Sequence, residues 1–324
     1  MTTLPYPIDT PLTLPKLGSW PESRHVFDEP SAYALAAAEA ANRPLLVRGE
    51  PGTGKSQLAR AAAVARQRLF LSVVVNARTE CQELQWQFDA VGRLGEAQML
   101  AHAPEADLRQ RLQPQYFLTP GPLWWVFDWQ AALAQWQTCL SPLQPVPLHP
   151  QSWQPAQGSV LLIDEIDKAD TDLPNGLLET LGNGDFTVPY LRDSVRQQAE
   201  HSPPPLVIIT TNEDRELPAA FVRRCLVLHL QLPTEDEALI ALLCQRGLVH
   251  FQQSCSKKVR RQAAELLLRD RKAALAQGLP PPGQAEYLDM LRAVSRMVQG
   301  EQAQLDLLER ISPFNLCKAS PPRR

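Results

Sequence analysis

Residues 49–56 constrain the fold of this chain more than any other feature, because they fit the phosphate-binding loop pattern G-x-x-x-x-G-K-[ST]. They lie between an apolar run, Leu45–Val47, and a segment, Leu58–Arg68, that we expect to be helical. A strand, a glycine-rich loop and a helix in this order are the context that such a loop requires. The loop residues are Gly49, Glu50, Pro51, Gly52, Thr53, Gly54, Lys55 and Ser56, and Gln57 completes the expected binding set.

The residue types in this loop suit the binding of a phosphate chain. Glycines let successive backbone N–H groups turn toward one point, and the N-terminus of the following helix adds its positive dipole end. Lys55 can reach the β- and γ-phosphates, while the Ser56 hydroxyl can be a ligand of Mg²⁺. The loop therefore predicts a nucleotide triphosphate and Mg²⁺ as cofactors.

The composition is that of an ordinary soluble protein. The chain has 324 residues, of which 44% are hydrophobic and 21% charged, and a length like this favours two domains. A net charge of -3 gives no overall attraction to nucleic acid or to anionic membranes. The sequence has no apolar run long enough to span a bilayer and no signal-peptide pattern, so we expect a cytoplasmic protein without a membrane partner.

Further short apolar runs indicate a parallel sheet that is buried on both faces. They are Leu69–Val75, Val160–Ile163, Leu206–Thr211 and Leu226–Leu230. Helical segments alternate with these runs, which is typical of an α/β fold. We expect residues 31–232 to form this α/β domain, preceded by a proline-rich, irregular arm at 1–30 that lies over it.

The alternation is interrupted by an insertion at about residues 78–157, which is rich in glutamine, proline and tryptophan. We expect a helix at Cys81–His102 and a tryptophan-rich element around residues 121–125. Five of the seven tryptophans lie between Trp86 and Trp136. They could form a surface that contacts a client protein, but aromatic side chains mostly serve burial, which favours packing of the insertion onto the core.

After the insertion, we expect a helix that begins near Asp172 and stops at Gly182, followed by one arm of a hairpin at 185–190. A polar loop at 197–205 comes next. Residues 233–312 read as an all-helical second domain and 313–324 as a tail, of which Lys318–Arg324 should be frayed. A basic cluster between Lys257 and Lys272 could contact a polyanion, but interspersed acidic residues favour a solvated helix face.

Two adjacent carboxylates follow the apolar run that ends at Ile163. A nucleotide triphosphatase needs a carboxylate near Mg²⁺ and a group that activates water. Asp164 stands at the carboxyl end of the expected strand, where open α/β sheets bind ligands, and can hold Mg²⁺ through water. The neighbouring Glu165 can polarise the attacking water as a general base.

Three further residues could complete a catalytic site. Asn212 follows the run Leu206–Thr211, and its amide can contact the γ-phosphate or orient water without adding charge. Arg223 and Arg224 stand just before the last apolar run, and a guanidinium suits the charge of a phosphoryl transition state. A salt-bridging surface pair explains these two arginines equally well from their position alone.

Taken in order, the motifs GEPGTGKS, VLLIDEID and ITTNEDRELPAAFVRRC, followed by helices, resemble the AAA+ ATPases. The segment Arg78–Val91 is similar to the helix-2 insertion of the MoxR-like branch, and the hairpin near Phe186 is similar to that family's hairpin. The resemblance covers about residues 31–310. It implies a P-loop NTPase fold with a parallel five-stranded sheet of order 5-1-4-3-2, a C-terminal helical lid and a hexameric ring.

The resemblance also implies roles for single residues. Asn212 matches the sensor-1 position, and Arg224 matches the arginine finger that reaches the ATP of the next subunit, with Arg223 as a substitute. One position departs from the family pattern. MoxR-like lids place a sensor-2 arginine at the start of a helix, where this chain has Pro282–Tyr287, and Arg292 comes a turn or more later.

We therefore interpret the chain as an ATP-driven remodelling ATPase that acts on a protein client, with ATP and Mg²⁺ as cofactors. The MoxR-like resemblance implies a ring-shaped homo-oligomer and a partner protein with a von Willebrand A domain. Two alternatives stay open. One is a nucleic-acid-directed motor similar to McrB, although the chain has no strong basic patch. The other is a nucleotide-dependent switch or scaffold with little turnover, which would have no need of Glu165.

Overall fold

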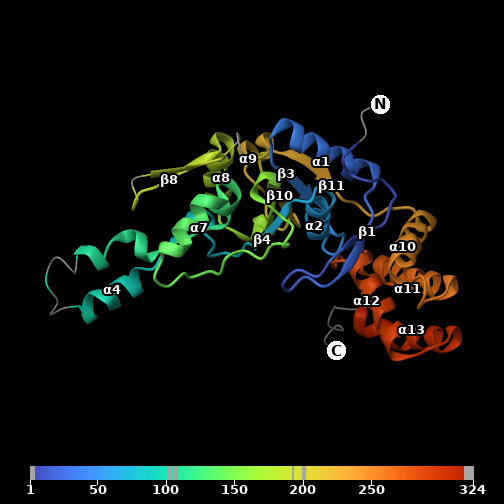
Figure 1. Cartoon of the computed structure of the whole chain (residues 1–324). Helices are drawn as coiled ribbons and strands as arrows, with labels where there is room; N and C mark the ends of the chain where they lie inside the picture. Colours follow the sequence, from blue (N-terminus) through green and yellow to red (C-terminus); the bar gives the residue numbers. More distant parts are fainter. Residues whose placement is uncertain (1–3, 101–103, 105–108, 192, 199–201, 317–324) are drawn as a thin grey trace.

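The computed structural model describes residues 4–100, 104, 109–191, 193–198 and 202–316. Its centre is a parallel sheet of five strands in the order β11-β3-β10-β7-β4 (Figure 1). Along the chain these strands are β3 (Leu45–Arg48), β4 (Leu69–Val74), β7 (Ser159–Asp164), β10 (Leu206–Thr211) and β11 (Leu226–His229). Counted as strands one to five, they have the order 5-1-4-3-2, which confirms the expected α/β P-loop fold.

Apolar side chains cover both faces of the sheet, which explains why its strands read as continuous apolar runs. In β7, Val160 and Leu162 point to one face, while Leu161 and Ile163 point to the other. Helices α1 (Glu29–Ala41) and α2 (Lys55–Ala65) cover the first face. Helices α8 (Asp172–Asn183) and α9 (Ala219–Arg224) and the insertion cover the second.

The N-terminal arm packs onto the face that carries α1 and α2. Its side chains Tyr6, Leu14 and Phe27 are fully buried in the core on this face. The arm is more regular than expected, because β1 (Leu12–Leu14) and β2 (Ser23–His25) form an antiparallel pair. Arg60 of α2 is buried beneath the arm, and its guanidinium donates to the Pro21 carbonyl at 2.8 Å.

The expectation of one helix over Cys81–His102 is wrong. The segment forms a short helix α3 (Cys81–Gln85), a strand β5 (Trp86–Phe88) and a second helix α4 (Ala90–Met99), and residues 101–103 lie outside the described part. The helix breaks because Trp86 turns into the core and β5 pairs with β6 (Leu118–Pro120). This pairing joins residues that are about thirty positions apart in the sequence, so local helical propensity cannot reveal it.

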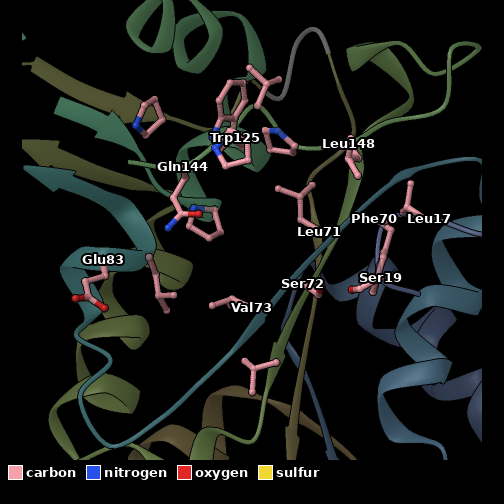
Figure 2. Close-up of a pocket in the computed structure, with 18 of the residues that line it drawn as sticks. Leu17, Ser19, Phe70, Leu71, Ser72, Val73, Glu83, Trp125, Gln144 and Leu148 are labelled. Atoms are coloured by element: carbon pink, nitrogen blue, oxygen red, sulfur yellow. The ribbon is translucent and has the colours of Figure 1, made fainter. Parts of the chain in front are cut away.

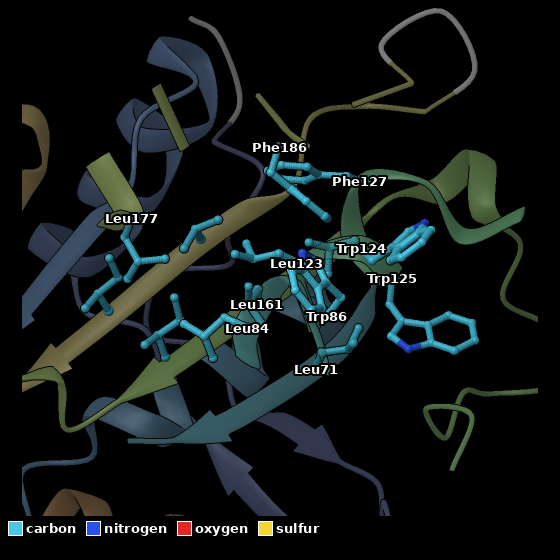
Figure 3. Close-up of a cluster of buried hydrophobic side chains, with 14 of the residues drawn as sticks. Leu71, Leu84, Trp86, Leu123, Trp124, Trp125, Phe127, Leu161, Leu177 and Phe186 are labelled. Atoms are coloured by element: carbon cyan, nitrogen blue, oxygen red, sulfur yellow. The ribbon is translucent and has the colours of Figure 1, made fainter. Parts of the chain in front are cut away.

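The remaining elements of the insertion are short. They include the 3-10 helices η1 (Pro114–Phe117) and η2 (Pro155–Gln157) and the α-helices α6 (Pro122–Phe127) and α7 (Trp129–Thr138). All five residues from Leu123 to Phe127 are buried, as are Trp86 and Trp153, against the second face of the sheet (Figure 3). The tryptophans of the insertion therefore mainly serve packing, as we expected.

The segment after β7 contains one helix and a hairpin. After the 3-10 helix η3 (Ile166–Lys168), α8 runs through Gly182, which was expected to end it, and stops at Gly184 in the left-handed conformation with φ +68°. Strands β8 (Asp185–Val188) and β9 (Asp193–Arg196) form the expected antiparallel hairpin. The expected loop at 197–205 includes residues 199–201, which lie outside the described part.

Four helices follow the sheet and share a core of their own. They are α10 (Asp236–Phe251), α11 (Lys257–Ala276), α12 (Gln284–Met297) and α13 (Glu301–Asn315). Helix α13 extends past residue 312, and the expected frayed end, Lys318–Arg324, lies outside the described residues. Figure 1 shows these helices at one end of the molecule and α4 with the β8–β9 hairpin toward the other.

Most of the basic cluster on α11 is exposed, and part of it is ion-paired within the helical region. Arg261 pairs with Glu237 and Glu265, and Lys272 pairs with Asp236. Arg260, by contrast, is buried and donates to the Cys255 carbonyl at 2.6 Å. No described helix has the length and the apolar character needed to cross a membrane.

The second face of the sheet should dominate stability in the insertion. Replacing Leu84, which is 2% exposed, with alanine should lower the free energy of unfolding by about 2–5 kcal/mol, because it opens a cavity beside Trp86 and Leu123. Replacing Leu94 of α4, which is 60% exposed, with alanine should change the free energy of unfolding by less than about 0.5 kcal/mol. Urea denaturation of both variants measures the difference, and equal losses would contradict this packing.

Candidate functional site

The carboxyl ends of three neighbouring strands bring the candidate residues together. The loop 49–56 follows β3, Asp164 ends β7 and precedes Glu165, and Asn212 follows β10. These strands are adjacent in the sheet, so their carboxyl ends meet at one edge. The side chains border a cavity of about 360 Å³, which is large enough for part of a nucleotide.

The phosphate loop needs glycine where the chain passes close to other backbone. Gly49 has φ +154°, and a Cβ there would lie 2.3 Å from the Leu230 carbonyl oxygen. Gly52 has φ +77° and faces the N-terminus of α12, where a Cβ would lie 3.2 Å from that of Ala285. The Ala285 amide donates to the Gly52 carbonyl at 3.1 Å, so the helical region directly contacts the loop.

Lys55 is buried at the base of the loop and makes three hydrogen bonds. Its ammonium donates to the carbonyls of Gly49 at 2.7 Å and Glu50 at 2.9 Å. The third bond, to Asn212 Oδ1 at 2.7 Å, joins the loop to the end of β10. Burial lowers the pKa of Lys55, an effect opposed by the nearby negative charge of Asp164 and other carboxylates.

Ser56 and Asp164 provide the oxygen atoms that a magnesium ion prefers. The Ser56 hydroxyl donates to both carboxylate oxygens of Asp164, at 3.0 and 2.9 Å. The Thr210 hydroxyl also donates to Asp164, at 2.5 Å, which fixes the carboxylate between α2 and β10. A hydroxyl and a carboxylate beside a phosphate-binding loop fit Mg²⁺, a hard cation that binds oxygen ligands.

Glu165 occupies a strained position directly after β7. Its backbone is left-handed with φ +62°, and its amide donates to the Thr210 hydroxyl at 2.9 Å. This conformation holds its carboxylate at the cavity, where Asn212 Nδ2 lies 3.5 Å from Oε1. The Lys168 ammonium donates to Oε2, and this hydrogen bond raises the pKa of Lys168.

Two residues near Glu165 were not singled out in the sequence. Asp167 is 2% exposed, and its Oδ2 accepts from the backbone amides of Asn212 at 3.2 Å and Asp214 at 3.0 Å. Asp167 thus fixes the turn that carries Asn212. Asp167 and Lys168 follow Glu165 by two and three residues in the sequence, but only the fold shows what each of them contacts.

The N-terminal half of α12 forms the opposite wall of the cavity. Its lining residues Gln284, Ala285, Leu288, Asp289 and Arg292 are three to four positions apart, as expected for one helix face. Arg292 therefore borders the nucleotide cavity despite its late position in the sequence, and it pairs with Asp289. A second link is the ion pair of Arg271 on α11 with Glu50 of the loop, at 2.6 Å.

A second cavity of about 280 Å³ adjoins the first and shares Gly54, Gln57 and Arg292 with it. Its walls come from the arm, β11, α10 and α12. Three polar atoms on its lining residues are buried without a hydrogen-bond partner in the described structure: His25 Nε2, Gln57 Oε1 and Arg246 Nε. Burial lowers the pKa of His25 to about 3 and that of His250 to about 4, so both rings are neutral at pH 7.

Arg223 and Arg224 lie outside this site. Both are exposed at the C-terminal end of α9, and their backbone carbonyls accept from the guanidinium of Arg43. Arg223 lines a surface cavity with Arg48 and Glu213, while Arg224 lines another beside α8. Neither borders the cavity that contains Lys55 and Asp164.

The five-stranded sheet, the loop after β3 and the acidic pair after β7 define a P-loop ATPase of the AAA+ class. The sequence profile of the family described as "AAA domain (dynein-related subfamily)" matches residues 44–225, more than half of the chain. The chain belongs to this family, and it is a nucleotide-binding ATPase. A comparison with curated proteins found no match.

Solved structures returned by comparison are distant in sequence. An ATPase candidate from Cytophaga hutchinsonii is 12% identical and has a TM-score of 0.37, with 88% of this chain and 79% of that chain covered. RuvB of Thermotoga maritima, described as a Holliday junction branch migration motor, is 16% identical at a TM-score of 0.41, covering 87% and 67%. A single-residue variant of that RuvB is 14% identical at a TM-score of 0.47, covering 87% and 68%.

The buried neutral His25 makes stability depend on pH. Its pKa is lowered from 6.5 to about 3 on folding, so the unfolded chain binds a proton more readily than the folded one. The contribution of the neutral His25 to the free energy of unfolding is therefore fully present above pH 6.5 and is lost as the pH falls toward 3. Between pH 6.5 and 4, the free energy of unfolding should fall by up to ~1.4 kcal/mol per pH unit from this residue. Urea titrations of wild type and His25→Gln should show a shallower slope for the variant, whereas the same change at exposed His149 should leave the slope unaltered.

Proposed function

We propose that this chain is an ATP-hydrolysing remodelling motor of the MoxR-like kind, which acts on a protein client as a ring of identical subunits. One observation carries the proposal. Lys55, Ser56, Asp164, Glu165 and Asn212 border a single cavity, while the two arginines that could complete the site face outward elsewhere. In a site built in this way, a neighbouring subunit contributes the arginine that contacts the nucleotide.

Within one subunit, each residue has a distinct task. Lys55 binds phosphate oxygens. Its ammonium gives up its hydrogen bonds to the Gly49 and Glu50 carbonyls and donates to these oxygens instead. Ser56 and Asp164 hold Mg²⁺, which when bound offsets the negative charge of the phosphates. Glu165 accepts a proton from the attacking water as general base, and Asn212 orients that water or contacts the γ-phosphate. The remaining residues of the loop and Gln57 surround the phosphates and the start of α2.

The outward-facing arginines support a ring. Arg224 is the proposed finger for the nucleotide of the next subunit, with Arg223 beside it as the substitute. Both guanidiniums are exposed and therefore accessible to a neighbour. Because guanidinium stays charged at any physiological pH, it can stabilise the transition state from across an interface. A hexamer is the stoichiometry that the MoxR-like resemblance suggests.

The helical region, which we place at residues 233–312, serves as a lid that reports the state of the nucleotide. Its contacts with the phosphate loop are direct: Arg271 pairs with Glu50, and the Ala285 amide donates to Gly52. Arg292 borders the cavity and can exchange Asp289 for a nucleotide oxygen. A change in the nucleotide therefore alters contacts that the lid itself makes.

Work on the client falls to the two elements that project from the body (Figure 1). Helix α4 carries Val91 and Met99, which are 82% and 77% exposed, and has no buried residue. The β8–β9 hairpin lies beside the insertion, since Tyr190 stacks on Phe88 with ring centroids 4.2 Å apart. Exposed apolar side chains on projecting elements suit a protein client. A protein with a von Willebrand A domain is the partner that the family resemblance suggests.

The role of Glu165 gives the main test of this function. Glu165→Gln keeps the shape of the side chain but removes its basicity, so it should retain ATP while lowering phosphate release by about a hundredfold or more. Phosphate release and bound nucleotide are measured on the same sample. Glu179→Gln, a change at an exposed carboxylate on α8, should behave as wild type. Near-normal turnover of Glu165→Gln would remove Glu165 from its role.

The ring requires the arginine to act between subunits. In mixtures of wild type with Arg224→Ala, ATPase activity should fall more steeply than the wild-type fraction, because each variant subunit disables its neighbour's site. Arg223→Ala mixed in the same way is the matched control and should show the smaller effect. Activity that is proportional to the wild-type fraction would contradict a site shared between subunits.

A further inference from the structure

A further cavity, of about 530 Å³, lies along the outer edge of the sheet (Figure 2). Its lining includes every residue from Phe70 to Val74, so it follows strand β4 along most of its length. Strand β4 is the last strand of the sheet on this side. The cavity shares no lining residue with the nucleotide cavity.

The backbone of β4 presents unused hydrogen-bonding groups to this cavity. On the side that faces β7, the Leu69 amide donates to the backbone carbonyl of Gly158 at 3.0 Å. The Val75 amide, just after β4, donates to the backbone carbonyl of Asp164 at 2.9 Å. Backbone groups alternate in direction along a strand, so those of Phe70, Ser72 and Val74 point away from β7. In the described part of the chain, no strand pairs with β4 on that side.

Among the described residues, those in the other walls of the cavity form no hydrogen bond with these groups. The segment 144–148 contains Pro145 and Pro147, which have no N–H to donate. The Gln144 carbonyl already accepts from the Trp136 indole at 2.8 Å. The arm lines the cavity with Leu17 and Trp20, and the insertion contributes Trp125 and two further prolines. The cavity is therefore a groove of mixed apolar and uncharged polar character beside an unpaired strand edge.

The charge of the groove is as distinctive as its shape. Glu83 is the one ionisable side chain among the residues that line it. Figure 2 shows Glu83 at one end of the cavity, while Leu17 and Ser19 lie at the other end beside Phe70. Val74, the last residue of β4, is 61% exposed. A ligand complementary to these walls is uncharged and partly apolar along most of its length and carries one positive charge toward Glu83.

We propose that this groove binds an extended peptide segment of a partner protein, which adds to β4 as a further strand. Its backbone pairs with Phe70, Ser72 and Val74, its alternate side chains are apolar, and a Lys or Arg lies opposite Glu83. Six residues of β4 span about 20 Å, so the segment has about five or six residues in contact. The arm and the segment 144–148 border the edge, which favours a single extended chain over the sheet edge of a second folded copy.

The test uses the full chain and a display library of random linear peptides as the probe. Selected peptides should alternate apolar residues and carry a Lys or Arg near one end. Synthetic versions of these peptides then carry N-methyl groups on alternate amides, and their affinity for the protein tests whether the peptide backbone pairs with β4. Methylation of one alternate set should abolish binding, and methylation of the other set should leave it intact, because only one set faces β4.

Two substitutions place the peptide on the groove. Ser72→Pro removes one outward amide at an exposed edge position, where proline is tolerated, and should weaken binding by about tenfold. Ser72→Ala keeps that amide and should bind as wild type. Glu83→Lys should reverse the preference from basic to acidic peptides. None of these residues belongs to the nucleotide site, so ATPase activity without peptide should stay unchanged.

Several results would overturn the proposal. These are the absence of any selected peptide, equal binding of both N-methylated sets, or selected peptides with no basic residue and no response to Glu83→Lys. A change of oligomeric state in Ser72→Pro, without loss of peptide binding, would assign the edge to a second copy. Tighter peptide binding after removal of residues 317–324 would assign it to the chain's own end. The N-methylated peptides act on the wild-type protein, so they decide the question even if Ser72→Pro does not fold.

Discussion

The Asp164 carboxylate is the contact on which the site depends. It ends β7, which lies between β10 and the edge strand β4, and accepts hydrogen bonds from Ser56 on α2 and from Thr210 on β10. Through it, the phosphate loop, the acidic pair and the strand before Asn212 have fixed positions relative to one another. A partly buried carboxylate needs such donors, because burying its charge without them would be costly. The same oxygens are the ones that suit a magnesium ion.

Lys55 extends this network to the other end of the cavity. Its ammonium donates to the loop carbonyls and to the Asn212 side chain. The Asp167 carboxylate accepts a hydrogen bond from the Asn212 backbone amide. Asp164 and Asp167 are therefore two carboxylates with different tasks. Asp164 faces the cavity, and Asp167 accepts backbone amides in the interior. The candidate base Glu165 stands between them in a left-handed conformation that the Thr210 hydroxyl stabilises.

The two edge strands of the sheet, β11 and β4, border different parts of the molecule. The edge strand β11 follows α9 and its exposed arginines, which the proposed ring requires. The opposite edge strand β4 borders the arm and the insertion, where the groove lies. The nucleotide cavity lies at the carboxyl ends of the strands between them. The nucleotide cavity, the proposed subunit contact and the proposed peptide groove thus occupy separate places around one sheet.

The sequence alone determined that the chain contains a parallel sheet and a phosphate-binding loop, whereas the strand order 5-1-4-3-2 came from the resemblance to a known family. The sheet and the loop follow from short local patterns: apolar runs, glycine spacing and a carboxylate pair at the end of an expected strand. The tertiary structure decided the rest, because it depends on contacts between distant residues. Trp86 breaks a helix by pairing with Pro120, Asp167 reaches Asn212, and Arg292 reaches the cavity from a helix two hundred residues away from the loop. No local pattern records such contacts, since they form only when the chain has folded.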